Sequence, residues 1–178
     1  MTVNLEIICI GNELLIGKIL NTNAHWLAKE STALAIYVKR VTVVRDTLED
    51  ISSSILEALA RKPEFIITTG GLGPTFDDMT LQGVAKALDC KLEVNPEALE
   101  MVKERSNQYA KKRGLPTPLE MTKPRIKMAT FPENTDPVNN PIGTAPGLQV
   151  KIQNTTLFVL LGLFAGVWVD RLRRRPLM

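Results

Sequence analysis

The sequence is poor in the residues that support thiol, zinc or covalent chemistry. Only two cysteines, Cys9 and Cys90, occur among 178 residues, and neither belongs to a CxxC pair. Isolated cysteines exclude the usual zinc sites and are typical of reduced thiols in a cytosolic protein. The one histidine, His25, has no accompanying serine or cysteine pattern of the kind that activates a nucleophile. We therefore expect a cytoplasmic protein without zinc and without a covalent nucleophile.

Membrane-spanning runs and nucleic-acid signals are also lacking. The apolar stretch 157–169 has thirteen residues, fewer than the ~20 needed to cross a bilayer. The N-terminus has neither a basic region nor a cleavage pattern, so no secretory signal is expected. Aromatic residues make up only 5%, and much of the net charge of +3 comes from arginines after position 170. Without interleaved basic and aromatic residues, we expect neither a nucleic-acid nor a membrane partner.

Short apolar runs alternate with helical periodicity through the first half of the chain. The pattern predicts strands at 5–10, 38–44 and 65–68, and helices at 17–33, 47–61 and 78–88. Continuous apolar strands separated by helices are typical of a parallel sheet covered on both faces. We therefore predict an α/β fold for a single domain over residues 1–160.

The second half is expected to be less regular. Prolines are frequent in residues 114–147, and only 125–131 within this range has the pattern of a strand. A charged helix is predicted over 95–114, before this stretch. After it, 147–152 and 156–160 are predicted to form a short antiparallel hairpin around Gln153 and Asn154.

The segment FIITTGGLGPTFDDMT, residues 65–80, carries the clearest chemical signal. A buried strand leads into a glycine-rich loop and then an acidic pair, Asp77 and Asp78. Glycines let backbone N–H groups approach a polyanion, and the start of a helix favours negative charge. The carboxylates are ligands for the divalent cation, such as Mg²⁺, that accompanies phosphates. We predict a phosphorylated small-molecule ligand, contacted here by Thr69, Gly70, Gly71, Gly73 and Thr75.

Asp77 and Asp78 can each be interpreted in two ways. Both are candidates for catalysis and for holding the metal, but aspartate is also a common helix cap. We favour Asp77 as the cap and Asp78 as the carboxylate of the pocket.

Two further segments are expected at the same pocket. Ligands bind beyond the carboxyl ends of parallel strands, which places the turn Gly11, Asn12 and Glu13 and also Asp46 at its rim. Glu13 has the alternative of a solvated surface residue, and Asp46 that of a charge at a helix N-terminus. The loop 140–147 is predicted to contact the base or sugar of the ligand through Asn140, Gly143 and Thr144. Its alternative is a structural turn before the hairpin.

Three motifs together resemble a known family. IGNELLIGKILNTN (10–23), TTGGLGPTFDDMT (68–80) and NPIGTAPGL (140–148) are similar in order and spacing to the CinA N-terminal domain. That domain belongs to the molybdopterin-binding superfamily with MoaB, MogA and the gephyrin G-type domains. The resemblance implies a three-layer α/β/α fold and a homo-oligomer.

Three candidate functions are considered, and the resemblance implies the first two. The first is metal-dependent hydrolysis of an ADP-ribose-like pyrophosphate. The second is adenylylation of molybdopterin with ATP and magnesium, as in MogA-like relatives, and the third is a non-catalytic nucleotide-binding module. One segment departs from the family: an LPGVPxEM-like continuation is replaced by LLGLFAG at 160–166. We therefore expect 161–178 to be an atypical, truncated or disordered tail.

Overall fold

The computed structural model describes residues 2–71 and 78–160. Its strands are β1 (Val3–Ile10), β2 (Ile36–Val44), β3 (Phe65–Thr69), β4 (Leu92–Val94), β5 (Thr130–Pro132), β6 (Asp136–Val138), β7 (Gly147–Ile152) and β8 (Thr155–Leu160). Its helices are α1 (Asn12–Leu15), α2 (Thr22–Ala33), α3 (Leu48–Ala60), α4 (Thr80–Leu88), α5 (Pro96–Lys112) and α6 (Lys123–Lys127). None of these helices is long and apolar enough to cross a membrane.

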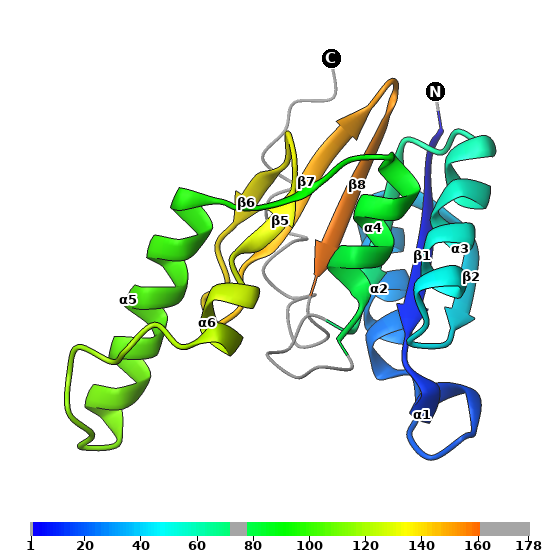
Figure 1. The fold of residues 1–178 in the computed structure, drawn as a ribbon. Helices are drawn as coiled ribbons and strands as arrows, with labels where there is room; N and C mark the ends of the chain where they lie inside the picture. The colour runs from blue at the N-terminus through cyan, green and yellow to red at the C-terminus, as the bar shows by residue number, and fades with distance from the viewer. Residues whose placement is uncertain (1, 72–77, 161–178) are drawn as a thin grey trace.

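A six-stranded sheet in the order β2-β1-β3-β8-β7-β6 forms the centre of the fold. The first four strands are parallel, whereas β7 and β6 run antiparallel to their neighbours. A separate pair, β4 and β5, is antiparallel. The sheet is therefore mostly parallel, and the carboxyl ends of β1, β2, β3 and β8 lie along one edge (Figure 1).

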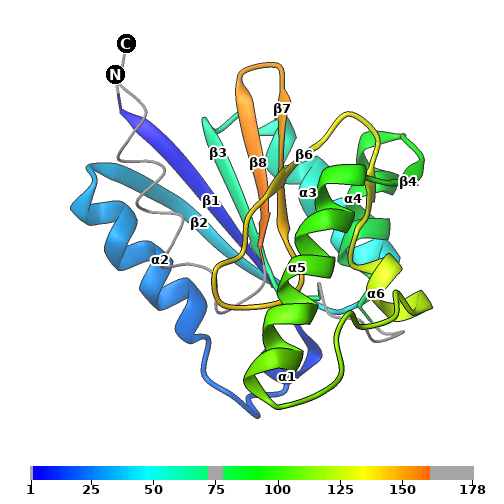
Figure 2. The same ribbon diagram turned by 90° about the vertical axis from the view of Figure 1, so that its left-hand side faces the viewer.

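Helices cover both faces of the sheet, which makes three layers (Figure 2). On one face α2 buries Ala24 and Leu27 against strand residues that include Ile7. On the other face α3, α4 and α5 bury an apolar cluster in which Ile51, Val84 and Val102 are completely enclosed. Each sheet residue contributes to one face only, because side chains alternate along a strand. The predicted α/β/α architecture is confirmed.

Several element boundaries differ from the prediction for local reasons. The helix predicted over 17–33 begins only at Thr22, because Asn21 caps it by accepting a 3.0 Å bond from the Ala24 N–H. Gly17, at φ +69°, interrupts the chain before that cap. The strand predicted at 125–131 was wrong: residues 123–127 form α6, and a short strand starts at Thr130. The β7–β8 hairpin is confirmed, with Gln153 in a left-handed conformation at its turn.

Candidate functional site

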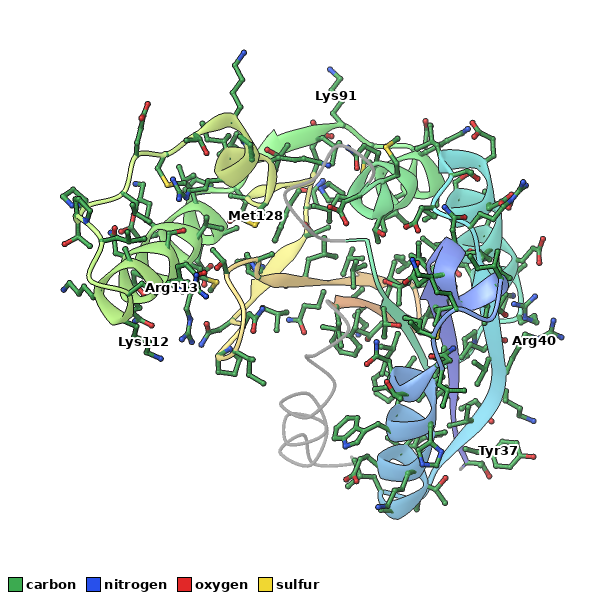
Figure 3. All side chains as sticks on the ribbon, turned by 90° about the horizontal axis from the view of Figure 1, so that it is seen from below. Tyr37, Arg40, Lys91, Lys112, Arg113 and Met128 are labelled. Atoms are coloured by element: carbon green, nitrogen blue, oxygen red, sulfur yellow. The ribbon has the colours of Figure 1, made fainter. Side chains whose placement is uncertain are left out.

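The described residues that were predicted to form the site lie at or near the edge where the parallel strands end, and Figure 3 views the molecule from that side. Two turns are fixed to neighbouring strands by backbone bonds. The Gly11 N–H donates to the Val44 carbonyl at 3.0 Å, and the Gly70 N–H donates to the Leu160 carbonyl at 3.2 Å. The turn after β1 and the turn after β3 are therefore held in register at one edge, as the sequence predicted.

Asp46 connects these two turns. Its Oδ2 accepts a 3.2 Å bond from the Asn12 N–H, so the backbone of the first turn is tied to the end of β2. A Cβ placed on Gly71 would lie 3.3 Å from Oδ1 of the same carboxylate. The half-buried Asp46 thus lies between the first turn and the glycine turn and braces backbone, directly before Thr47, which is the N-cap of α3.

The two glycines of the described part of the motif are required by close contacts. Gly70 has φ +107°, and a Cβ there would overlap with the Ile10 carbonyl oxygen. Gly71 has φ +64°, and a Cβ there would overlap with the Thr80 hydroxyl. Side chains are therefore excluded at both positions by space as well as by conformation.

Thr80 is a residue of this edge that the sequence patterns did not single out. It is completely buried, and its hydroxyl donates a 3.0 Å hydrogen bond to the Gly70 carbonyl. This bond ties the first turn of α4 to the glycine turn. A threonine at a helix start is too common a signal to have revealed a contact that depends on tertiary approach.

Asp78 lies just before α4, which begins at Thr80 rather than at the predicted position 78. The Asp78 side chain is half-buried, and its carbonyl accepts a 3.0 Å bond from Lys127 Nζ on α6. Lys127, which the sequence patterns also missed, therefore fixes the chain where it enters α4. Gly73, Thr75 and Asp77 lie outside the described residues, so their predicted roles stay predictions.

The loop 140–147 lies at the same edge, because Gly147 starts β7 opposite Val138 and close to the Val159 carbonyl. The Asn140 side chain is buried and organises the loop itself. Its Oδ1 accepts from the N–H groups of Ile142 at 2.9 Å and Gly143 at 2.6 Å, and its Nδ2 donates to the Ala145 carbonyl at 2.8 Å. Gly143 and Thr144 are half-buried on the outer part of the loop.

Thr69 and Glu13 differ in their access to this edge. Thr69 is only 2% exposed at the end of β3, so this residue offers almost no surface to a ligand. Glu13 is half-buried in α1, and its carboxylate lies over Gly11, where a Cβ would come within 2.6 Å of Oε1. Any ligand that reaches the Gly11 backbone must displace or contact this carboxylate.

Two described carboxylates flank the glycine turn in the chain, and magnesium takes one or two carboxylates plus phosphate oxygens and water. Asp46 and Asp78 are half-buried carboxylates whose oxygens could ligate a metal, and they precede and follow Gly71 in the chain. Among residues 2–71 and 78–160, no group of three or more acidic, histidine or cysteine side chains is placed to hold a metal.

Residues 6–168 match the protein family described as "Probable molybdopterin binding domain". The chain belongs to this molybdopterin-binding domain family. Within it, the chain is similar to a crystal structure of the protein CinA, of unknown function, from Thermoplasma acidophilum. That similarity has 34% identity and a TM-score of 0.83 over 97% of both chains.

Solved structures of lower sequence identity share the fold. MoaB of Pyrococcus furiosus, a tungsten cofactor synthesizing protein, is 14% identical with a TM-score of 0.59 over 97% of this chain and 91% of its own. Archaeal proteins are closer in sequence: one from Metallosphaera sedula is 44% identical over 158 residues, 89% of this chain and 57% of that protein. Another protein, from Sulfolobus acidocaldarius, is 48% identical over 158 residues, which are again 89% of this chain and 57% of that protein. The chain thus spans somewhat over half the length of these relatives.

Proposed function

We propose that this edge binds the phosphates of a nucleotide-like ligand and hydrolyses an ADP-ribose-like pyrophosphate with the help of a divalent cation. The observation that carries the proposal is the convergence of the Gly11 turn, the Gly70–Gly71 turn and Asp46 at one edge. Glycines let backbone approach a phosphate closely, and a cation would have to offset the Glu13 carboxylate that lies over Gly11.

The charge of the edge supports a metal partner. Glu13, Asp46 and Asp78 place acidic groups around a position proposed for phosphate, and like charges repel unless a cation lies between them. Asp46 and Asp78 would hold the metal, which when bound supplies charge neutralisation and activation of water. Asp46 orients the Asn12 backbone through its 3.2 Å bond, and Thr80 and Lys127 fix the glycine turn and the start of α4. The residues around the glycine turn are therefore held in place by hydrogen bonds of the chain itself, and preorganised polar groups are the main protein contribution to transfer at phosphorus.

A second candidate is a molybdopterin adenylyltransferase or molybdopterin-binding protein, which the family description supports. Its chemistry breaks the α–β phosphoanhydride of ATP, releases pyrophosphate and forms a new phosphoanhydride between AMP and the pterin phosphate, and it needs the same phosphate-binding edge. A third candidate is a module that binds a nucleotide without converting it. Self-association, expected from the resemblance, is a separate proposal that sedimentation analysis would test.

One assay separates the three candidates. The protein is incubated with ADP-ribose, or with ATP and molybdopterin, each with and without magnesium, and the products are separated by chromatography. We expect AMP from ADP-ribose only when magnesium is present. Adenylylated pterin would instead support the second candidate, and tight binding without any product would support the third. The absence of both binding and turnover, with either set of compounds, would contradict the proposal.

A further inference from the structure

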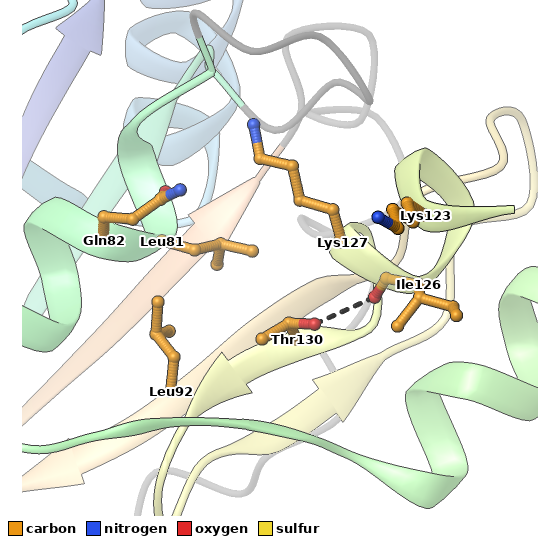
Figure 4. A pocket seen from close by; sticks show the side chains of 7 residues that line it. All are labelled: Leu81, Gln82, Leu92, Lys123, Ile126, Lys127 and Thr130. Atoms are coloured by element: carbon orange, nitrogen blue, oxygen red, sulfur yellow. Dashed lines mark hydrogen bonds between the residues drawn. The ribbon is translucent and has the colours of Figure 1, made fainter.

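Two cavities adjoin β2, away from the glycine turn. Their volumes are about 240 Å³ and about 250 Å³, and each is lined by residues of β2 and of α3 or its end. A third cavity, of about 280 Å³, lies between α4, β5 and α6 (Figure 4). It belongs to the site described above, because Lys127 in its wall binds the Asp78 carbonyl at 3.0 Å. The two cavities beside β2 have no part in that site.

The strand β2 has one unpaired side, which we call the open side of β2. In the sheet order, β1 lies on one side of β2 and no described strand lies on the other. The Val44 carbonyl accepts the Gly11 N–H at 3.0 Å, so the backbone groups of Val44 point toward β1. Backbone groups of successive strand residues point to opposite sides, which directs those of Val41 and Val43 to the open side. Val41 is 45% exposed, and Arg40 lies at the rim of the molecule in Figure 3. A row of exposed N–H and C=O groups of this kind can pair with an added strand.

A bulge in β2 shapes the cavity of about 240 Å³. Leu5 pairs with Val38, but the next residue of β1, Glu6, pairs with Arg40, so Lys39 is an extra residue on β2. Adjacent strand residues normally point to opposite faces, yet Lys39 and Arg40 both line this cavity. Bulges redirect side chains in this way and are frequent beside functional sites.

The bulged cavity is basic. Arg61 and Lys62, at the end of α3, join the two cations of β2 in its lining. Glu6, the one carboxylate among the described lining residues, is only 4% exposed. Both of its oxygens accept from Arg61, from Nε at 2.8 Å and from Nη2 at 2.7 Å, so the ion pair holds the guanidinium in the wall. Positive charge remains in excess, and the cavity therefore attracts a carboxylate.

The cavity of about 250 Å³ lies further along the same strand. Its lining includes Thr42 and Val44 of β2 and Ser53 and Glu57 of α3, and it is mixed in polarity. Thr42 follows Arg40 by two residues, which is about 7 Å along a strand, and it lies on the same face. An added strand presents every second side chain with the same spacing, so its side chains can enter both cavities. Backbone pairing for affinity and pockets for alternate side chains are the physical basis of recognition by strand addition.

We propose that the open side of β2 binds an extended, acidic segment of a partner protein as an added strand. A carboxylate of that segment occupies the basic cavity, and a small polar side chain occupies the second. The cations of β2 disfavour a second copy of this chain, which would bring the same charges to the open side. Nucleic acid shares the negative charge but has no peptide groups to pair with Val41 and Val43.

The probe is a fluorescein-labelled peptide of eight residues, with glutamate at its first and third positions, serine at its fifth and seventh, and valine at the others. Fluorescence anisotropy measures its affinity for the whole chain. We expect binding roughly tenfold or more tighter than that of the same peptide with lysine in place of both glutamates. A peptide with every backbone amide N-methylated should not bind, because it cannot form the strand bonds. Hydrogen exchange at the amides of Val41 and Val43 should slow when the acidic peptide binds.

The combined substitution Lys39→Gln with Arg40→Gln is expected to weaken binding of the acidic peptide by roughly tenfold or more. Its matched control is Lys111→Gln with Lys112→Gln, which removes two adjacent exposed cations of α5. Lys112 lies on the opposite side of the molecule from Arg40 in Figure 3. The control should bind the peptide as tightly as the unmodified protein, and equal losses in the two variants would overturn the proposal.

Four further outcomes would overturn the added strand. The first is equal binding of the glutamate and lysine peptides, and the second is binding that leaves exchange at Val41 and Val43 unchanged. The third is slow exchange at these amides without peptide in a protein that sediments as a dimer, which would assign the open side to a second copy. The fourth is tighter binding of single-stranded DNA of eight nucleotides than of the acidic peptide, which would assign the surface to nucleic acid.

Discussion

Gly70→Ala is expected to lower the free energy of unfolding by about 3 kcal/mol or more, through backbone strain and a steric clash together. At φ +107° the backbone conformation favours glycine, and the added Cβ would meet the Ile10 carbonyl oxygen, which cannot move without disturbing β1. Because Gly70 also donates to Leu160, the shift would spread to β8. Chemical denaturation with urea, followed by circular dichroism, measures the change directly.

Gly17→Ala measures the cost of a positive φ without a clash. Gly17 has a φ of +69°, close to the left-handed helical region, and nothing lies within 4 Å of the position of its Cβ. The same substitution there should cost only about 1 kcal/mol. Equal losses for the two variants would show that the contact with Ile10 does not constrain the glycine turn.

Asp78→Asn is expected to reduce magnesium-dependent release of AMP from ADP-ribose by roughly 100-fold or more, the usual scale for loss of a group that activates water or holds the metal. The substitution preserves the size of the side chain and leaves the Asp78 carbonyl, which Lys127 binds, in place. The fold should therefore be retained. Turnover is measured at saturating magnesium, with the unfolding midpoint as the check on folding.

The matched control is Asp89→Asn at the opposite end of α4. Asp89 is exposed and adopts a left-handed conformation, which asparagine tolerates well. It should keep full turnover. If Asp78→Asn were as active as Asp89→Asn, the role proposed for Asp78 would be wrong, although the binding edge would be unaffected.

The parallel sheet and the location of the candidate site were predictable because both follow from local pattern. Apolar runs such as 65–68 are long enough to identify buried strands, and the turns after parallel strands must meet at one edge. The glycines of the motif were also identified from the sequence, but the contacts that require glycine at these positions were not. A larger residue would not fit at position 71 because Thr80 and Asp46 lie close to it. Their positions depend on how α4 and the end of β2 pack.

Other features could not be found in the sequence because their signals are short or misleading. The residues 125–131 alternate in polarity as a strand would, yet Pro124 lies in the first turn of the short helix α6. β4 and β6 have only three residues each, too few for a periodic pattern. The Asn140 side chain has a role in holding its own loop together that no spacing rule reveals.

The central claim is that phosphate binds where the parallel strands end. The competing location is the basic cavity of about 240 Å³ at the start of the strands, lined by Arg40, Arg61 and Lys62, which electrostatics alone would favour. Backbone amide shifts recorded by two-dimensional NMR during titration with ADP-ribose and magnesium distinguish the two directly. We expect the largest changes at the amides of Gly11, Gly71 and Gly143. Changes centred on Arg40 and Lys62, with none at the glycine turn, would contradict the account.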